Sequence, residues 1–234
     1  MLGFFDYTVW LTYMSLLSAS LGIMVTLNGG GHPYMGIIFL LICGLCDAFD
    51  GRVARTKKDR TEVQKKFGIQ IDSLSDLAAF GILPACIGNA MIKVCPTVYD
   101  IPPIKGGRKL DIYTSILFYT IILIYILAAL VRLAYFNVME EERQKTETGN
   151  RKCFRGVPVT SAALVFPTVL LIQFITPGDI TPVYFAFLLV TAVAFVTDIK
   201  VPKPGLRGIL IMCGIGLVEL IAFIYFFNKF AGRG

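Results

Sequence analysis

Seven long apolar stretches separated by polar segments constrain the fold of this chain more than any other feature. They span roughly residues 8–28, 33–54, 68–93, 112–138, 157–176, 181–197 and 207–228. A helix needs about 20 apolar residues to cross a bilayer, so each stretch predicts a transmembrane helix, the sixth being the shortest. With 56% hydrophobic and 16% charged residues, the chain is unlike a soluble domain. We therefore expect an all-α, polytopic membrane helical bundle of about seven helices, forming one domain over residues 1–234.

Basic residues are distributed unevenly between the connections of this bundle. Sixteen of the 22 Lys and Arg residues lie in residues 52–66, 132–155 and 200–207, which seven spans place on one side. The positive-inside rule makes that side cytoplasmic. The net charge of +6 is explained by loops beside anionic lipid, so no nucleic acid partner is expected. The compact chain favours the cytoplasmic (inner) membrane of a prokaryote.

Four aspartates lie at the ends of the second and third stretches. Asp47 and Asp50 are three residues apart and Asp72 and Asp76 are four apart, so each pair shares one face of its helix. If the two helices form a hairpin, these faces can meet. An isolated charge near the bilayer core costs about 2.5–3.5 kcal/mol, and converging carboxylates repel. A hard divalent ion, Mg²⁺ or Mn²⁺, resolves both problems, which predicts a metal site at the cytoplasmic end.

Small residues and arginines accompany the acidic faces. Gly51 and Ala54 flank the first aspartate pair, and Gly68 lies in one helical row with Asp72 and Asp76. Glycine there lets a backbone or a flat ligand approach closely. Arg55 and its neighbour Arg52 can face a diphosphate.

This pattern resembles a known family signature. Asp47-x2-Asp50-Gly51-x2-Ala54-Arg55, followed by Gly68-x3-Asp72-x3-Asp76, is similar at eight fixed positions to that of the CDP-alcohol phosphatidyltransferases, integral membrane enzymes of phospholipid biosynthesis. One departure is visible, because the usual spacer of eight residues between the arginine and the next glycine is twelve here, residues 56–67. Four extra residues are about one helical turn, so they can lengthen the connection without rotating the acidic face.

The resemblance implies a six-helix core plus one helix, a homodimer, and a lipid-linked CDP donor, CDP-diacylglycerol, which an alcohol attacks to release CMP. It implies Mg²⁺ or Mn²⁺, as two ions, held by Asp47, Asp50, Asp72 and Asp76, with Asp76 also taking the proton of the hydroxyl. The implied nucleotide and diphosphate pocket contains Thr12, Gly51, Ala54, Arg55 and Gly68. For Thr12, which shares a face with Ser15 and Ser18, the structural alternative is small-residue helix packing.

The serine-accepting branch of the family is the most similar. Asp72-Ser73-Leu74-x-Asp76 followed by Phe80-Gly81-x2-Pro84 is typical of that branch, as is the run from Arg132 to Asn137, although Tyr135 replaces its second arginine. This resemblance implies L-serine as the acceptor, bound by Arg132, Asn137 and Arg155. A guanidinium binds carboxylate bidentately, but a snorkelling arginine at 132 and a positive-inside arginine at 155 are the structural alternatives.

Two other functions remain open. The same chemistry can use another acceptor, glycerol 3-phosphate or inositol phosphate. Intramembrane carboxylates also mark cation or proton-coupled transporters, which would predict acidic residues spread through the membrane depth. Here the four aspartates cluster at one end, and the one other acidic residue deep in a span is Glu219, which we expect to pair with a neighbouring helix.

Overall fold

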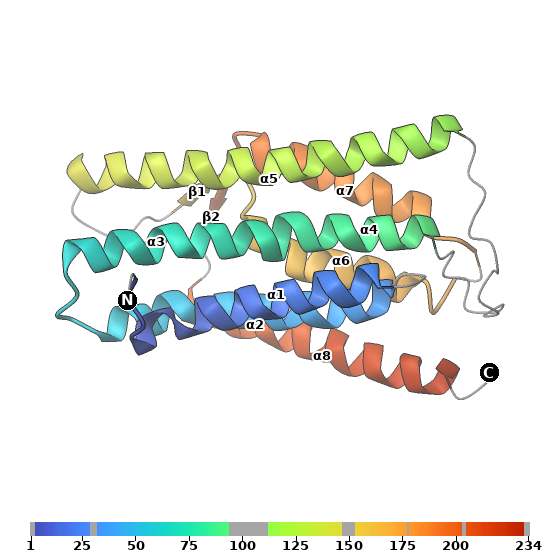
Figure 1. Cartoon of the computed structure of the whole chain (residues 1–234), viewed down its shortest axis with the longest axis horizontal. Helices are drawn as coiled ribbons and strands as arrows, with labels where there is room; N and C mark the ends of the chain where they lie inside the picture. The colour runs from blue at the N-terminus through green and yellow to red at the C-terminus, as the bar shows by residue number, and fades with distance from the viewer. Residues whose placement is uncertain are drawn as a thin grey trace.

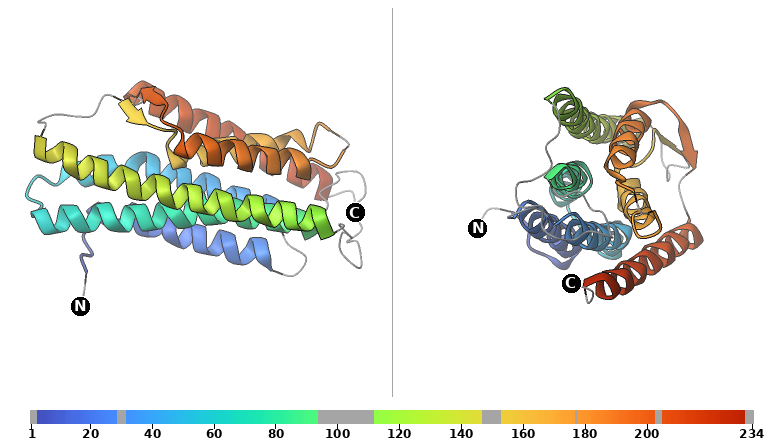
Figure 2. Two further views of the ribbon diagram at one scale, coloured as in Figure 1. Left: turned by 90° about the horizontal axis from the view of Figure 1, so that it is seen from above. Right: turned by 90° about the vertical axis from the view of Figure 1, so that its right-hand side faces the viewer.

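In the computed structural model, the described residues are 3–28, 32–93, 112–146, 153–176, 178–202 and 205–231. Long helices within these ranges lie side by side in one elongated bundle (Figures 1 and 2). In chain order the elements are η1 (Tyr7–Val9), α1 (Trp10–Leu27), α2 (Pro33–Thr56), α3 (Glu62–Asp76), η2 (Leu77–Ile82), α4 (Leu83–Lys93), α5 (Ile112–Thr146), β1 (Cys153–Arg155), η3 (Val159–Ser161), α6 (Ala162–Ile172), α7 (Thr181–Val196), β2 (Lys200–Pro202) and α8 (Leu206–Ala231). All seven predicted stretches are helical.

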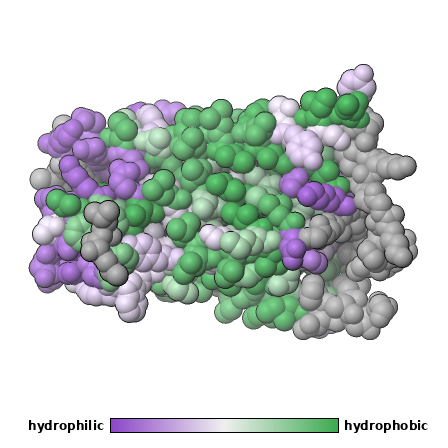
Figure 3. Space-filling model, in the orientation of Figure 1, coloured by the Kyte–Doolittle hydropathy of each residue, from purple (hydrophilic) through white to green (hydrophobic). Residues whose placement is uncertain are grey.

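The apolar surface of the bundle is that of an integral membrane protein. By length and composition, the described chain has four helices able to cross a membrane, Tyr7–Leu27, Glu62–Lys93, Ile112–Arg143 and Leu206–Phe226. Two shorter apolar helices, Val159–Ile172 and Thr181–Val196, accompany them. Hydrophobic side chains form a broad band, and hydrophilic ones gather at the end where α2 is connected to α3 (Figure 3). The all-α polytopic class is confirmed, whereas seven crossings stay a prediction.

A small β-ribbon was not predicted. β1 pairs antiparallel with β2, so that Phe154 lies opposite Val201. The ribbon joins the connection before α6 to the one before α8. Directly after β1, Gly156 adopts a positive φ of 75°, and its N–H donates to the carbonyl of Ile199 at 2.7 Å. The ribbon therefore fixes where the chain enters η3 and α6.

α1 packs closely on α2 through a face of small residues. Thr12, Ser15 and Ser18 are all buried, and Ser18 Oγ donates to the carbonyl of Phe39 at 3.3 Å. At Gly22, a Cβ would lie only 2.7 Å from the Cβ of Phe39, so the absence of a side chain permits the approach. This face therefore packs as the structural alternative for Thr12 describes, and the role of Thr12 in the nucleotide pocket stays a prediction.

The third span is a composite helix. A π-helical segment, η2, begins immediately after Asp76 and leads to α4, where Pro84 has no N–H to donate to the carbonyl of Phe80. The hydroxyl of Tyr125 on α5 donates to that carbonyl at 2.6 Å. The hydroxyl of Tyr184 on α7 donates to the carbonyl of Pro84 at 2.9 Å. Two buried tyrosines thus support the π-helical segment and the start of α4.

The N-terminal segment is tied to the end of α2 by polar contacts. Asp6 accepts hydrogen bonds from Thr8 and from Lys57 Nζ, the latter at 3.0 Å. The hydrogen bonds from Thr8 and then Lys57 lower the pKa of Asp6 to about 2. At neutral pH, Asp6 is therefore charged and holds the start of the α2–α3 connection.

Candidate active site

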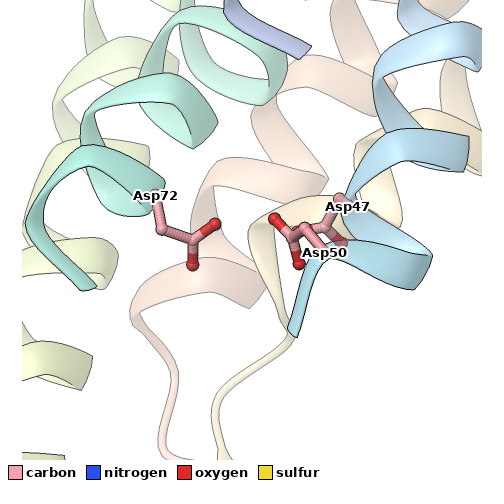
Figure 4. A group of neighbouring side chains, drawn as sticks. All are labelled: Asp47, Asp50 and Asp72. Atoms are coloured by element: carbon pink, nitrogen blue, oxygen red, sulfur yellow. The ribbon is translucent and has the colours of Figure 1, made fainter. Parts of the chain in front are cut away.

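Three of the four predicted aspartates converge between α2 and α3. Asp47, Asp50 and Asp72 each offer a carboxylate oxygen, and these oxygens all lie within 4.8 Å of one another. Asp72 points from α3 toward the two aspartates of α2 (Figure 4). The predicted hairpin geometry, in which two acidic helix faces meet, is thus present.

The orientation of α3 follows from the side chains on either side of Asp72. Ser73 and Asn137 of α5 exchange hydrogen bonds, with Asn137 Nδ2 donating to Ser73 Oγ at 2.8 Å. Ser75 Oγ donates to the carbonyl of Thr12 on α1 at 3.2 Å. Because consecutive helical residues point in different directions, these contacts with α5 and α1 turn Asp72 and Asp76 toward α2.

The aspartate cluster has the chemistry of a hard cation site. Three carboxylates at such distances repel one another unless protons or a cation neutralise them. Their donor atoms are all oxygen, the ligand type that Mg²⁺ and Mn²⁺ prefer, and positions left open can be completed by phosphate oxygens or water. Asp47, Asp50 and Asp72 therefore fit a divalent metal ion.

Asp76 is the fourth predicted aspartate. It lies one helical turn beyond Asp72 and is only 9% exposed. It is not one of the three residues whose carboxylate oxygens lie within 4.8 Å of one another. It nevertheless lines the same cavity as they do. Asp76 can therefore meet the same ligand as the three converging aspartates, and its role as a metal ligand stays a prediction.

A cavity of about 730 Å³ extends from the aspartates along the bundle. One part of its lining is polar, with the four aspartates, Arg52, Arg55 and Arg132. The remainder is largely apolar and comes from α2, α6 and α8, including Leu41, Leu164 and Leu220. A single cavity therefore offers a charged end and an apolar groove, which suits an amphiphilic ligand.

Arg132 reaches this cavity from α5. The residue is only 6% exposed, its Nε donates to the carbonyl of Val157 at 3.2 Å, and its guanidinium lies 5.2 Å from the ring centroid of Phe136. A snorkelling side chain would extend into solvent instead. The guanidinium is held at the cavity wall, where it can bind an anionic group.

The other predicted site residues divide into two groups. Gly51 and Arg55 line the cavity, and an added Cβ at Gly51 would lie 3.5 Å from Arg55 Nη1. Within the described part of the chain, the remaining five are not among the lining residues: Thr12, Ala54, Gly68, Asn137 and Arg155. Asn137 is bound to Ser73, and Arg155, half exposed, lies 3.9 Å from Asp198 Oδ2.

Two features of the site region were missed or left without a role. Arg60, which the sequence analysis did not single out, covers Gly68 and donates a hydrogen bond to the carbonyl of Ala54 at the end of α2. Glu219 is buried on α8 and accepts a hydrogen bond from Thr168 of α6, so the expected pairing with a neighbouring helix is confirmed. The longer α2–α3 spacer was the one sequence signal that pointed to Arg60.

The chain is similar in sequence to a family of membrane transferases. A profile of the CDP-alcohol phosphatidyltransferase family matches residues 7–199. A CDP-diacylglycerol–serine O-phosphatidyltransferase of Helicobacter pylori is 27% identical over 198 residues, covering 82% of this chain and 72% of its own. An archaetidylserine synthase of Methanothermobacter thermautotrophicus is 30% identical over 192 residues, covering 81% of this chain and 68% of its own. A CDP-diacylglycerol–serine O-phosphatidyltransferase of Saccharomyces cerevisiae is 34% identical over 143 residues, 60% of this chain and 43% of its own.

Proposed function

The chain belongs to the CDP-alcohol phosphatidyltransferase family, and from that premise we propose that it transfers the phosphatidyl group of CDP-diacylglycerol to L-serine. The products are phosphatidylserine and CMP, which makes the protein a transferase of phospholipid biosynthesis. The relatives named after serine or archaetidylserine chemistry support this acceptor. One observation carries the proposal: the aspartates and Arg132 line one cavity that continues as an apolar groove.

The donor is divided between the two parts of this cavity. The diphosphate lies against the aspartates and Arg55, and the acyl chains follow the apolar groove beside α8. Ala54, Gly68 and Thr12 are not among the residues that line the cavity, and their role in binding the nucleotide stays a prediction from the family resemblance. Asp47, Asp50 and Asp72, with Asp76 as the fourth candidate ligand, would hold Mg²⁺ or Mn²⁺, as two ions, and the metal would supply charge neutralisation for the diphosphate and for the departing CMP.

The acceptor is held by arginine. The guanidinium of Arg132 binds the serine carboxylate through paired hydrogen bonds. Asn137 acts through Ser73, next to Asp72, and Arg155 can assist only by leaving Asp198. Arg132 is therefore the principal acceptor residue.

Asp76 takes the proton in the transfer step. The serine hydroxyl oxygen forms a bond to the lipid-side phosphorus, and the bond from that phosphorus to the CMP oxygen breaks. The hydroxyl proton passes to the carboxylate of Asp76, while CMP leaves with its own phosphate. Asp76 lines the same cavity as the three converging aspartates, which supports this role.

Orientation and assembly belong to the same proposal. We propose that the aspartates lie at the cytoplasmic face of a prokaryotic inner membrane, where serine and CMP are soluble, and the positive-inside rule applied to the basic connections supports this orientation. The hydrophilic end in Figure 3 is the end at which α2 is connected to α3, which supports this orientation. We also propose a homodimer, as the family resemblance implies.

The test is CMP release by the purified protein in detergent with CDP-diacylglycerol and Mn²⁺ or Mg²⁺. Serine, glycerol 3-phosphate, inositol phosphate and no acceptor are compared. We expect metal-dependent CMP release with serine alone, and its loss in Asp76→Asn. Glu141→Gln, which removes an exposed carboxylate of α5 outside the cavity, serves as the matched control. Release with another acceptor would keep the chemistry and refute serine, whereas no release with any acceptor would refute the transferase.

A further inference from the structure

Arg60 connects the two helices that carry the aspartates. It lies in the connection between α2 and α3, and its Nη1 donates to the carbonyl of Ala54 at 3.4 Å while its Nη2 donates to that of Gln64 at 3.2 Å. A Cβ at Gly68 would lie 2.6 Å from Arg60 Nη2. The guanidinium therefore lies directly against the Gly68 backbone, bridging the last turns of α2 and the first turns of α3.

The charge of Arg60 is not balanced by the protein. Both of its acceptors are neutral carbonyls, and its Nε is buried without a hydrogen-bond partner. No carboxylate in the described parts of the chain forms an ion pair with it. A partly buried, uncompensated cation is costly for a folded protein, so this arrangement suits a site that receives an anion.

The Arg60 guanidinium lies close to the aspartates along the two helices. Ala54 is one helical turn after Asp50, and Gly68 is one turn before Asp72, a rise of about 5.4 Å on each helix. Arg60 is thus displaced from the carboxylates toward the α2–α3 connection, away from the apolar groove. For a donor whose lipid lies in that groove, the phosphate at this level is the one attached to the nucleoside.

We propose that Arg60 binds the nucleoside-side phosphate of the donor, the phosphate that leaves as CMP. This inference rests on the proposed function and deepens it. The planar guanidinium exchanges one or both carbonyls for phosphate oxygens, a bidentate geometry that arginine favours. The longer connection supplies the residue, because Thr61 and Gln64 form a capping box that starts α3 and sets Arg60 immediately before it.

CMP binding by the full-length protein in detergent, with Mn²⁺, tests the proposal by calorimetry. Arg60→Gln keeps one amide donor for a carbonyl but removes the charge, and we expect CMP affinity to fall about tenfold, the loss of one charge-assisted contact. Lys58→Gln removes a charge from an exposed residue of the same connection and is the matched control. Its CMP affinity should equal that of the wild type.

Arg60→Lys separates binding from support of the helices. Lysine keeps the charge but not the fork that spans two carbonyls, so it should retain most CMP affinity even where the apparent Tm falls. The role of Arg60 would be overturned if Arg60→Gln bound CMP as tightly as the wild type or more tightly. It would also be overturned if Arg60→Lys lost CMP affinity only in proportion to the fall in its apparent Tm. A wild-type protein that binds no CMP would instead refute the proposed function.

Discussion

Gly156 makes the strictest backbone demand near the acceptor side of the cavity. Its φ is +75°, and a Cβ there would lie 3.0 Å from the carbonyl oxygen of Phe195 and 3.2 Å from Arg132 Nε. The glycine therefore allows the ribbon to turn into η3 and leaves space for the arginine at the cavity wall. Backbone conformation and arginine placement depend on the same residue.

We expect Gly156→Ala to destabilise the protein and impair serine use. A non-glycine residue in this region costs about 1–3 kcal/mol, and the new methyl group displaces Arg132. Thermal unfolding in detergent should show a lower apparent Tm, and the KM for serine should rise more than that for CDP-diacylglycerol. Gly205→Ala is the control, because a Cβ at Gly205 meets nothing within 4 Å. Unchanged Tm and KM in Gly156→Ala would contradict this account.

Sequence reasoning succeeded for residues whose role is set by spacing. The i,i+3 and i,i+4 aspartates had to share faces, and the structure brings three of them together. It was less informative for Arg155, because nothing in a local pattern shows whether an arginine at a helix entry faces a cavity or a neighbouring carboxylate. Arg60 was missed because its contacts, with Ala54 and Gln64, depend on how the connection folds.

At the level of elements, the composite third span depends on support from its neighbours. Pro84 leaves the carbonyl of Phe80 without its usual helical donor, and Tyr125 supplies one from α5. Tyr125 also packs against Phe166 with ring centroids 5.6 Å apart, which fixes the position of its hydroxyl. The π-helical segment that follows Asp76 is thus stabilised by a contact between α5 and η2.

Tyr125→Phe should destabilise the bundle more than Tyr184→Phe does. When the Tyr125 hydroxyl is removed, the carbonyl of Phe80 stays buried and loses its hydrogen-bond donor, which costs about 1–3 kcal/mol. The carbonyl of Pro84 loses the hydroxyl of Tyr184 but can still accept the helical hydrogen bond of Gly88. Apparent Tm values of the two variants decide the comparison. A greater fall in apparent Tm in Tyr184→Phe would show that Tyr125 is not the main support of the π-helical segment.

The helices were predictable and the irregular elements were not, for physical reasons. Long apolar runs leave a chain in lipid little choice but a helix, so the helical ranges lie close to those expected from sequence. The π-helical segment needs both Pro84 and Tyr125, residues far apart in the chain. The β-ribbon consists of two three-residue strands, too short to show an alternating pattern. Both features arise only from tertiary contact.

For the whole molecule, the cavity joins surfaces that are distant in sequence. The polar end comes from α2, α3 and α5, whereas the groove is completed by α6 and α8, which follow all three of these helices in the chain. Figure 2 shows α8 lying obliquely against the rest of the bundle. The apolar runs predicted each helix but not which of them would share a cavity, since nearly all of their faces are apolar.

The groove makes a prediction about the lipid part of the donor. Gly216 of α8 lines the cavity, and a Cβ there would lie 3.6 Å from Leu164 Cδ2 and 3.8 Å from Leu41 Cδ2, so a large side chain must fill the groove. In Gly216→Phe we expect kcat/KM for long-chain CDP-diacylglycerol to fall about tenfold or more, a loss of roughly 1.4 kcal/mol in transition-state binding. CMP affinity should not change, because the nucleotide lies at the aspartates.

Two comparisons separate this effect from damage to the fold. Val218→Phe adds similar bulk at a residue that is 67% exposed and outside the cavity lining, so its activity should match the wild type. A short-chain donor, CDP-dihexanoylglycerol, should be affected less than the long-chain donor, because its acyl chains end nearer the polar part of the cavity. If Gly216→Phe reduced kcat/KM equally for both donors, or lowered CMP affinity, the acyl chains would have to lie elsewhere, and α8 would then complete the bundle without contacting substrate.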